Sequence, residues 1–372
     1  MSTIDDVARQ AGVSPVTVSR VINGAGNVKL ATREKVLRAI EELHYVPSTA
    51  ARSLRSKRTN TLALLVPDIT NPFWTTVSRG VEDSAQRGGY SVLLCNTDEN
   101  PEKLHRYLDV IISQRVDGAI VTPYDSDARN FARLRDRKIP SVVIDRRVDG
   151  WKVDTVRGDS ISGARALVNH LIRLGHRRIA MISGPRTTPT AEDRVTGYQI
   201  SLVEAGLSID SRLIKRGEFR ASSGESLTHQ VLEEGLNPTA IFASNNAIAM
   251  GVIKALSRRG LSIPEDIALV CFDDSPNLSP IFPFLTAVVQ PAYEMGVKAA
   301  ELLLNRLESG ESLPPRQIIL PSSLVIRYSC GTKKHELRFS LPDRAIEEEG
   351  ILVEPLSTGE RLELTRQIPS QN

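Results

Sequence analysis

Short polar side chains stand directly after several short apolar runs in the middle of the chain. Carboxylates and carboxamides at such positions offer hydrogen-bond acceptors and donors in a fixed array, which suits a small ligand with neighbouring hydroxyl groups. Side chains of these types also cap helices, and capping accounts for some of them. The residues concerned are Asp68, Asp145, Asn245, Asn246, Asp273, Asp274 and Gln290.

Motifs that would indicate catalysis are absent from the sequence. There is no G-x-S-x-G, no H-E-x-x-H and no phosphate-binding loop, and no G-x-G-x-x-G follows the first apolar run. Asp273 and Asp274 are adjacent, so they point in opposite directions on leaving a strand and cannot flank one glycosidic bond. His170 and His176 are six residues apart, the wrong spacing for two metal ligands on one helical face. We therefore expect binding rather than catalysis, with no cofactor and no metal.

The apolar runs that precede these polar residues predict a parallel sheet. They are short and rich in β-branched residues, and they alternate with amphipathic helical stretches at 73–89, 102–114 and 161–174. This pattern indicates a doubly wound α/β architecture of Rossmann type, in which ligands bind beyond the carboxyl ends of the strands. The predicted strands are residues 62–66, 91–94, 118–121, 141–144, 178–182, 240–243, 268–272 and 287–289.

The charge of the chain is unevenly distributed. Residues 1–60 contain ten Lys or Arg and five Asp or Glu, which gives +5, whereas the whole chain carries only +3. A basic N-terminal segment on a weakly acidic remainder predicts a polyanionic partner for that segment alone.

The basic segment begins with a pattern of three short helices. Thr3 can cap the first, Ser14 and Pro15 begin the second, and a third follows from about residue 32. Two short helices joined by a tight turn form a helix-turn-helix, which either is a small structural subdomain or binds DNA. Arg20 can pair with a guanine edge while Lys and Arg side chains of the third helix neutralise phosphates, which favours DNA binding.

Residues 48–58 form a second basic stretch. Ser48 can cap a helix of two turns, but so short a helix is marginal by itself in water. The stretch is therefore either a flexible linker or a hinge helix that orders on DNA and inserts Leu54 into the minor groove.

The N-terminal segment closely resembles the DNA-binding head of the LacI/GalR family of bacterial transcription regulators. The matching runs are TIDDVA (3–8), AGVS (11–14), TVSRVIN (17–23), TREKV (32–36) and YVP (45–47). The resemblance implies a head at residues 1–46, a hinge at 47–60, base contacts from Pro15, Val16 and Arg20, and a wedge at Leu54. The implied DNA-contacting residues are Thr3, Ser14, Pro15, Val16, Thr17, Ser19, Arg20, Asn23, Arg33, Tyr45, Ser48, Ala51, Leu54 and Arg55.

Residues 61–331 resemble the effector domain of the same family through the runs NPFW (71–74), RVDG (115–118), HLIRLGHRRIA (170–180) and CFDD (271–274). That domain is similar to periplasmic sugar-binding proteins, with two subdomains joined by three crossovers. Asn246 departs from the family, which usually has Asp there. By motif position the effector contacts are Phe73, Asp145, Arg194, Phe219, Asn245, Asp273 and Gln290.

About forty residues follow, at 332–372, without the leucine heptads of a tetramerising coiled coil. Residues 351–353 and 361–364 are either an extra hairpin or disordered, and no function is assigned to this extension.

The resemblance implies a ligand-responsive repressor that binds a near-palindromic operator as a homodimer and is released by a small sugar-like effector. The alternatives are a corepressor-dependent repressor, or a sugar-binding protein or sugar-processing enzyme on the same fold. The 372 residues contain no apolar run near the roughly 20 that a membrane span needs, no secretory signal, and three scattered cysteines. We therefore expect a cytoplasmic protein, associated with the nucleoid when bound to DNA, with no membrane partner.

Overall fold

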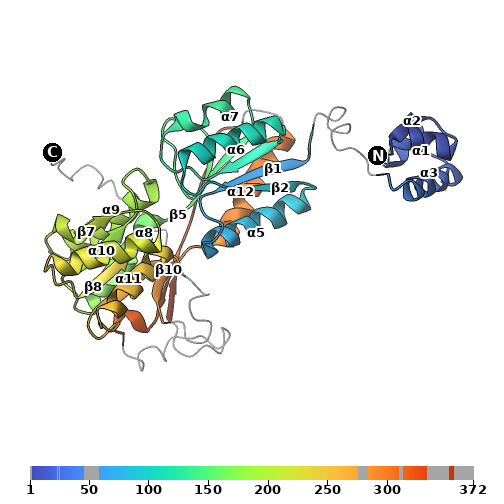
Figure 1. Cartoon of the computed structure of the whole chain (residues 1–372). Coiled ribbons are helices and arrows are strands. Elements are labelled where there is room, and N and C mark those ends of the chain that lie inside the picture. Colours follow the sequence, from blue (N-terminus) through green and yellow to red (C-terminus); the bar gives the residue numbers. More distant parts are fainter. Residues whose placement is uncertain are drawn as a thin grey trace. The chain divides into compact units, whose positions relative to one another are not determined.

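The computed structural model of the chain describes residues 2–22, 24, 26–45, 58–274, 284–309, 313–332 and 352–355. It divides into two compact units, Met1–Asn60 and Thr61–Asn372. The described residues of the first unit form the helices α1 (Ile4–Ala11), α2 (Pro15–Ile22) and α3 (Leu30–Glu42) (Figure 1).

The head, as we call the first unit, folds because each helix buries one apolar stripe. The Thr3 hydroxyl accepts a hydrogen bond from the Asp6 backbone and the Asp6 carboxylate accepts one from the Thr3 backbone, which forms a capping box for α1. Val7, Val18 and Val36, one from each helix, are fully buried and form the centre of the small core. The helix-turn-helix is confirmed, although α3 begins two residues before the predicted start.

A six-stranded parallel sheet organises the first lobe of the second unit, in the order β11-β5-β4-β3-β1-β2. Alternate residues of β1 face opposite sides: Leu62 and Leu64 pack with α5 and α12, whereas Ala63 and Leu65 pack with α6 and the α7 region. The strands are β1 (Thr61–Val66), β2 (Ser91–Asn96), β3 (Gly118–Val121), β4 (Ser141–Ile144), β5 (Asp154–Gly158) and β11 (Gln317–Leu320). The helices are α5 (Pro72–Arg87), α6 (Pro101–Ser113), α7 (Ala132–Asp136) and α12 (Ala292–Ser309).

The second lobe has a seven-stranded sheet in the order β13-β12-β10-β9-β8-β6-β7, parallel except where β12 pairs with β10 and β13. Met181 packs on one face with α8 and α9, and Ile182 packs on the other with α10 and α11. The strands are β6 (Ile179–Ser183), β7 (Ile214–Arg216), β8 (Ala240–Ala243), β9 (Ala268–Phe272), β10 (Thr286–Val289), β12 (Ser323–Ile326) and β13 (Leu352–Pro355). The helices are α8 (Ser160–Arg173), α9 (Pro189–Glu204), α10 (Ala221–Glu233) and α11 (Asn246–Arg258).

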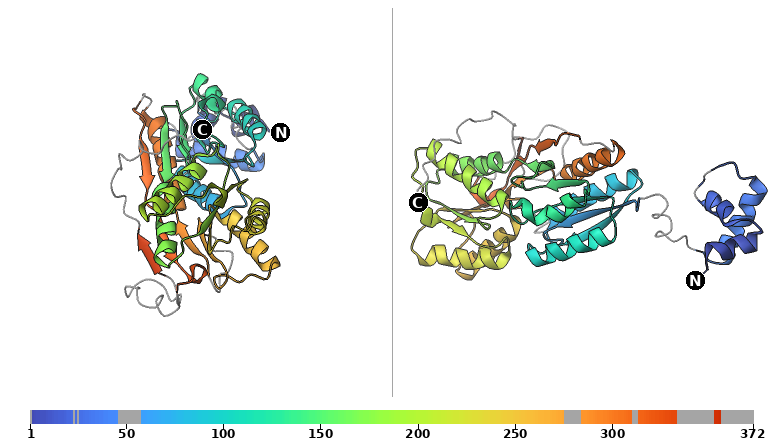
Figure 2. Two further views of the ribbon diagram at one scale, coloured as in Figure 1. Left: turned by 90° about the vertical axis from the view of Figure 1, so that its left-hand side faces the viewer. Right: turned by 90° about the horizontal axis from the view of Figure 1, so that it is seen from above.

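The chain passes between the lobes three times, at residues 158–160, 289–292 and 320–323. Helix α12 therefore lies among the elements of the first lobe although it comes late in the sequence, and the two lobes stand side by side (Figure 1, Figure 2). The first two crossings approach closely, because a Cβ built on Gly158 would lie 2.0 Å from Gln290 Oε1. A side chain at position 158 would therefore require the Gln290 side chain to move.

The α/β fold class is confirmed, and the eight predicted strands all exist within two residues of the expected bounds. Strands β5, β7, β11, β12 and β13 were not predicted. A partly exposed strand, such as β5, β7 or β11, lacks the continuous apolar run of a strand that is buried on both faces. Strand β12 is largely buried, so exposure does not explain why it was not predicted. Strand β5 has the sequence DTVRG and alternates between buried and half-buried residues, and β7 is only IKR.

The extension after residue 331 contributes one described strand. Leu352–Pro355 pairs antiparallel with β12, with Leu352 opposite Ile326. This strand adds to the edge of the second sheet. The hairpin that residues 351–353 and 361–364 would form stays a prediction. Residues 361–364 lie outside the described residues. No described helix has the length and apolar character required to span a lipid bilayer.

Candidate functional site

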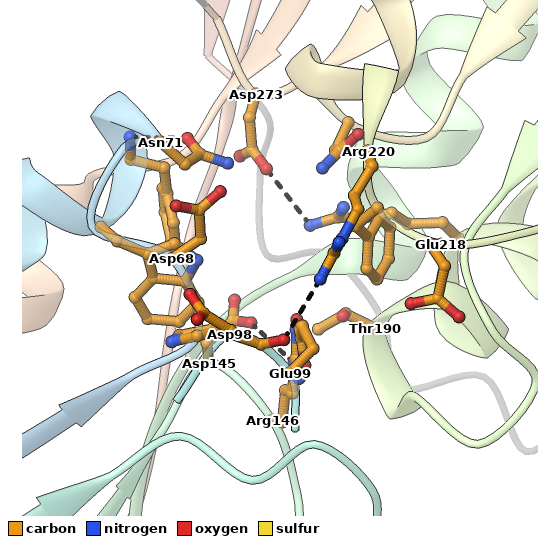
Figure 3. A pocket seen from close by; sticks show the side chains of 16 residues that line it. Asp68, Asn71, Asp98, Glu99, Asp145, Arg146, Thr190, Glu218, Arg220 and Asp273 are labelled. Carbon is orange, nitrogen blue, oxygen red and sulfur yellow. Dashed lines mark hydrogen bonds and ion pairs between the residues drawn. The ribbon is translucent and has the colours of Figure 1, made fainter. Parts of the chain in front are cut away.

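A cavity of about 390 Å³ lies between the two lobes of the second unit, beyond the carboxyl ends of both sheets. This is the position at which doubly wound sheets bind ligands. Polar side chains from both lobes point into it (Figure 3). The lining residues are Pro67, Asp68, Asn71, Phe73, Trp74, Asp98, Glu99, Asp145, Arg146, Thr190, Arg194, Glu218, Phe219, Arg220, Asn245 and Asp273.

The structure brings six of the seven expected effector contacts into this lining, and it places the seventh behind it. Gln290 is not among the lining residues. Its Nε2 donates to Asp273 Oδ1 at 2.7 Å, and its side chain is buried. Gln290 therefore holds Asp273 in place and does not face the cavity. The six that line it are Phe73, Asp145, Arg194, Phe219, Asn245 and Asp273.

Asp145 and Asp273 occupy equivalent positions in the two lobes. Each follows a central strand, β4 or β9, and each has a left-handed backbone, with φ of 68° and 64°. The backbone N–H of Asp145 donates to Val156 of the next strand, and that of Asp273 donates to Val288. Asp tolerates this conformation better than most residues with a Cβ. The backbone thus turns both carboxylates away from the sheet ladder at the mouth of each lobe.

An arginine lies against each of these aspartates. Arg146 Nε lies 3.6 Å from Asp145, while its two terminal nitrogens donate to the Glu99 carboxylate at 2.8 and 2.5 Å. Arg194 lies 3.5 Å from Asp273. Both guanidiniums are almost completely buried. A buried charge persists only when it is paired and hydrogen-bonded, and both arginines meet that condition.

Arg194 is held on three sides. Besides its ion pair with Asp273, its Nη1 donates to the Ser244 carbonyl at 2.6 Å. Its guanidinium lies 3.8 Å above the Phe272 ring, within the range of a cation–π contact. The planar group is therefore fixed in one orientation at the cavity wall.

Burial controls the protonation of the two aspartates. It raises the pKa of Asp145 from 3.8 to about 6, and the neighbouring Arg146 and Arg194 oppose that rise. Burial also raises the pKa of Asp273, against the effects of Arg194 and the hydrogen bond from Gln290. A ligand hydroxyl that donates a hydrogen bond to either carboxylate stabilises its charged form and so opposes the effect of burial on the pKa.

Asn71 and Asn246 connect the two lobes at the edge of the cavity. Asn71 Nδ2 donates to Asn246 Oδ1 at 3.1 Å, and Asn246 Nδ2 donates to Asn71 Oδ1 at 3.0 Å. An aspartate at 246, as is usual in the family that the sequence resembles, would lack the second of these donors. The neighbouring Asn245 caps α11, because its side-chain oxygen accepts from the Ile248 backbone at 2.8 Å. Capping, the alternative considered above, therefore applies to Asn245 even though it lines the cavity.

Replacing Asn246 with alanine is expected to weaken the closed arrangement of the lobes, since both hydrogen bonds are lost. If the two hydrogen bonds together stabilise the closed arrangement by about 1 kcal/mol net, their loss lowers effector affinity by up to about fivefold. The measurement is titration calorimetry with an effector, together with small-angle scattering for the separation of the lobes. Asn130→Ala is the control, because the Asn130 amide bonds Asp125 within one lobe. Equal effects from the two variants would contradict the role of the bridge.

The sequence did not identify several lining residues as contacts. Asp98 and Glu99 follow β2, so the same strand-end rule, applied to every strand, predicts them. Thr190 lies in the first turn of α9, away from any strand end. Glu218 and Arg220 follow β7, which is too short and polar for an apolar-run search. Asn71, Trp74 and Arg146 lie beside residues already singled out.

Metal binding has no support in the described residues, where no group of three His, Cys, Asp or Glu could hold an ion. His170 Nε2 instead lies 3.2 Å from Cys330 Sγ and 3.3 Å from Thr332 Oγ1 in a buried cluster. His176 contacts Thr239. Burial lowers the pKa of His170 to about 4, so this side chain is neutral near pH 7.

In the head, α2 presents an exposed surface. Pro15, Val16 and Arg20 are exposed, with Val16 at 53%, while the opposite side of the helix buries Val18 and Val21. Arg20 makes no ion pair with any other described residue. Its guanidinium is thus available for a hydrogen-bonding partner outside the chain.

The other expected DNA contacts lie around this surface or outside the described residues. Ser14 is exposed, and its hydroxyl accepts from the Thr17 backbone at the start of α2. Thr17 and Ser19 are half-buried, and Thr3 and Arg33 are exposed. Tyr45 packs against the head core. The expected contacts outside the described residues are Asn23, Ser48, Ala51, Leu54 and Arg55.

Comparison with known proteins places both units in one family. Residues 3–48 match the model for bacterial regulatory proteins of the lacI family, and residues 168–330 match a periplasmic binding protein-like domain. The HTH-type transcriptional regulator DegA of Bacillus subtilis is 36% identical over 334 residues, which cover 89% of this chain and 98% of DegA. The ribose operon repressor of Halalkalibacterium halodurans is 38% identical, with 88% and 96% covered.

Among solved structures, the chain is similar to a lac repressor dimer bound to operator and the anti-inducer ONPF. The two share 29% identity with a TM-score of 0.77, over 88% of this chain and 99% of that one. The chain thus matches known regulators along nearly their whole length. The chain belongs to the lacI family of bacterial regulatory proteins.

Proposed function

We propose that this protein is a transcriptional repressor that binds a near-palindromic operator as a homodimer and is released by a small, sugar-like effector. The proposal rests on the presence, in one chain, of an exposed recognition helix and of a polar cavity between two lobes. The related ribose operon repressor and the operator-bound lac repressor dimer support the same assignment. A repressor of this kind acts in the cytoplasm and associates with the nucleoid when bound.

The proposed mechanism couples the cavity to the hinge. Residues 1–46 are the DNA-binding head, 47–60 the hinge, 61–331 the effector and dimerisation domain, and 332–372 an extension. An effector that prefers one angle between the lobes changes the spacing of the two hinges in the dimer and hence operator affinity. It does so only through its different affinities for the two arrangements. Leu54 is the proposed minor-groove wedge at the operator centre.

Replacing Arg20 with alanine is the direct test of operator recognition. We expect discrimination between operator and random DNA to fall by about 1–3 kcal/mol, because a bidentate contact to a guanine edge is lost. Fluorescence anisotropy with operator DNA and with random DNA measures this difference in affinity. Both titrations use the same salt concentration, because salt weakens the electrostatic binding that the two DNAs have in common.

The matched control for this test is Arg106→Ala, which removes the same charge from an exposed site on α6 in the second unit. Equal weakening by Arg20→Ala on operator and random DNA would show that Arg20 contacts only phosphate. If no sugar changed the affinity of the protein for its operator, the part of the proposal that concerns the effector would be wrong.

A further inference from the structure

The charge balance of the cavity narrows the class of its ligand. Its lining carries six carboxylates and three guanidiniums. Figure 3 shows carboxylates on several sides of the space, contributed by both lobes. A ligand that enters is therefore surrounded by an excess of negative groups.

The two buried arginines, Arg146 and Arg194, already form hydrogen bonds and ion pairs with other groups of the protein. Arg146 uses both terminal nitrogens on Glu99 and also donates to the Pro123 carbonyl. Arg194 is occupied by Asp273 and the Ser244 carbonyl. The Nε of each has no hydrogen-bond partner in the described part of the chain and is covered by protein. Neither guanidinium offers the pair of adjacent N–H groups with which arginine binds a phosphate.

The third arginine of the lining, Arg220, is exposed. Its Nη2 donates to the Asp98 backbone carbonyl at 3.4 Å, across the cavity from its own lobe. Glu218, two residues earlier in the same loop, also lines the cavity, and so does Asp68 on the opposite lobe. Neither of these two carboxylates forms an ion pair with another described residue. An anion drawn to Arg220 therefore meets uncompensated negative charge on both sides.

We propose that the cavity selects an uncharged, hydroxyl-rich ligand, a free sugar, and rejects the phosphate ester of the same sugar. Hydroxyl groups donate to carboxylates, so the acidic lining favours a free sugar. A phosphate dianion in the same place is repelled by those carboxylates and finds no uncommitted buried cation. This inference rests on the proposed function and specifies the chemistry of its effector.

The test is titration calorimetry on the full chain with free pentoses and hexoses and with the phosphate esters of the same sugars, starting with ribose and ribose 5-phosphate. For any free sugar that binds, we expect its affinity to be at least tenfold higher than the affinity of its phosphate ester. The double variant Asp68→Asn, Glu218→Gln should shift the ratio of the two affinities about tenfold in favour of the ester. Asp136→Asn, an exposed acid on α7 outside the cavity, should leave this ratio unchanged.

The outcomes separate this inference from the proposed function. An ester that binds as tightly as the free sugar, or more tightly, overturns the inference while leaving a sugar-responsive repressor in place. A ratio that the double variant does not change also overturns it, because the discrimination then has another source. Binding of neither form of any sugar overturns the inference together with the proposed effector.

Discussion

Replacing Arg194 with alanine is expected to destabilise the second unit by about 3–5 kcal/mol and to abolish the response to effector. The guanidinium is almost completely buried against Asp273 and Phe272. Removing one member of a buried ion pair leaves the other charge without compensation, and this accounts for most of the loss. Chemical denaturation followed by circular dichroism measures the stability, and operator release by an effector measures the response.

Two further variants isolate the cause of the Arg194 effect. Arg194→Ala combined with Asp273→Asn removes both charges, so it should recover part of the stability while the effector response stays absent. Arg212→Ala breaks an ion pair with Asp210 in which the arginine side chain is 69% exposed, and it should change stability far less than Arg194→Ala, because solvent screens an exposed pair. If the effector-free protein lost operator affinity under conditions where it stays folded, Arg194 would be a structural residue and not an effector contact.

The free energy of unfolding is expected to fall by about 2 kcal/mol as the pH rises from 4 to 6, from Asp145 alone. The folded state keeps its proton up to a pKa of about 6, whereas the unfolded chain loses it near 3.8. Between these values the folded state binds more protons, so stability is greatest below the window and decreases as the carboxyl group ionises. Asp273 shifts in the same direction and adds to the effect.

The measurement is the midpoint of urea denaturation across this range of pH. Asp145→Asn should flatten the dependence, because the amide does not titrate, and Asp136→Asn on the surface should leave it unchanged. An effector hydroxyl that donates to ionised Asp145 should also bind more tightly above pH 6 than below it. An identical pH dependence in the wild type and Asp145→Asn would assign the titration to other groups.

Much of the fold follows from local patterns. The Thr3 capping box, the apolar stripe of α1 and the buried runs such as β4 are short-range features, so their existence and type could be predicted within two residues. Strands β5, β7 and β11 were not predicted because partial exposure removes the apolar signal. Strand β7 has only three residues, IKR, and is identified only by its pairing with β6.

The candidate site was predictable in part for the same reason. Asp145 and Asp273 each end a buried strand, so the sequence pattern predicts that each lies at the carboxyl edge of a sheet. The two residues belong to different sheets, after β4 in the first lobe and β9 in the second, so only the tertiary structure shows that they line one cavity. Arg146 is adjacent to Asp145 in the sequence, but its commitment to Glu99 is not visible there. Gln290 also follows a strand, yet it packs behind Asp273 and does not line the cavity.

The sequence by itself determined the class of this protein: a basic helix-turn-helix head, an α/β body with polar strand ends, and membership of a regulator family. These features depend on residue type and spacing over a few turns or strands, which local physics controls. Only the tertiary structure decided that Arg194 pairs with Asp273 and that Asn71 and Asn246 form hydrogen bonds with each other, because the members of each pair lie far apart in the chain. The chemistry of the cavity therefore depends on how the lobes bring these residues together, and burial raises the pKa of Asp145 and of Asp273.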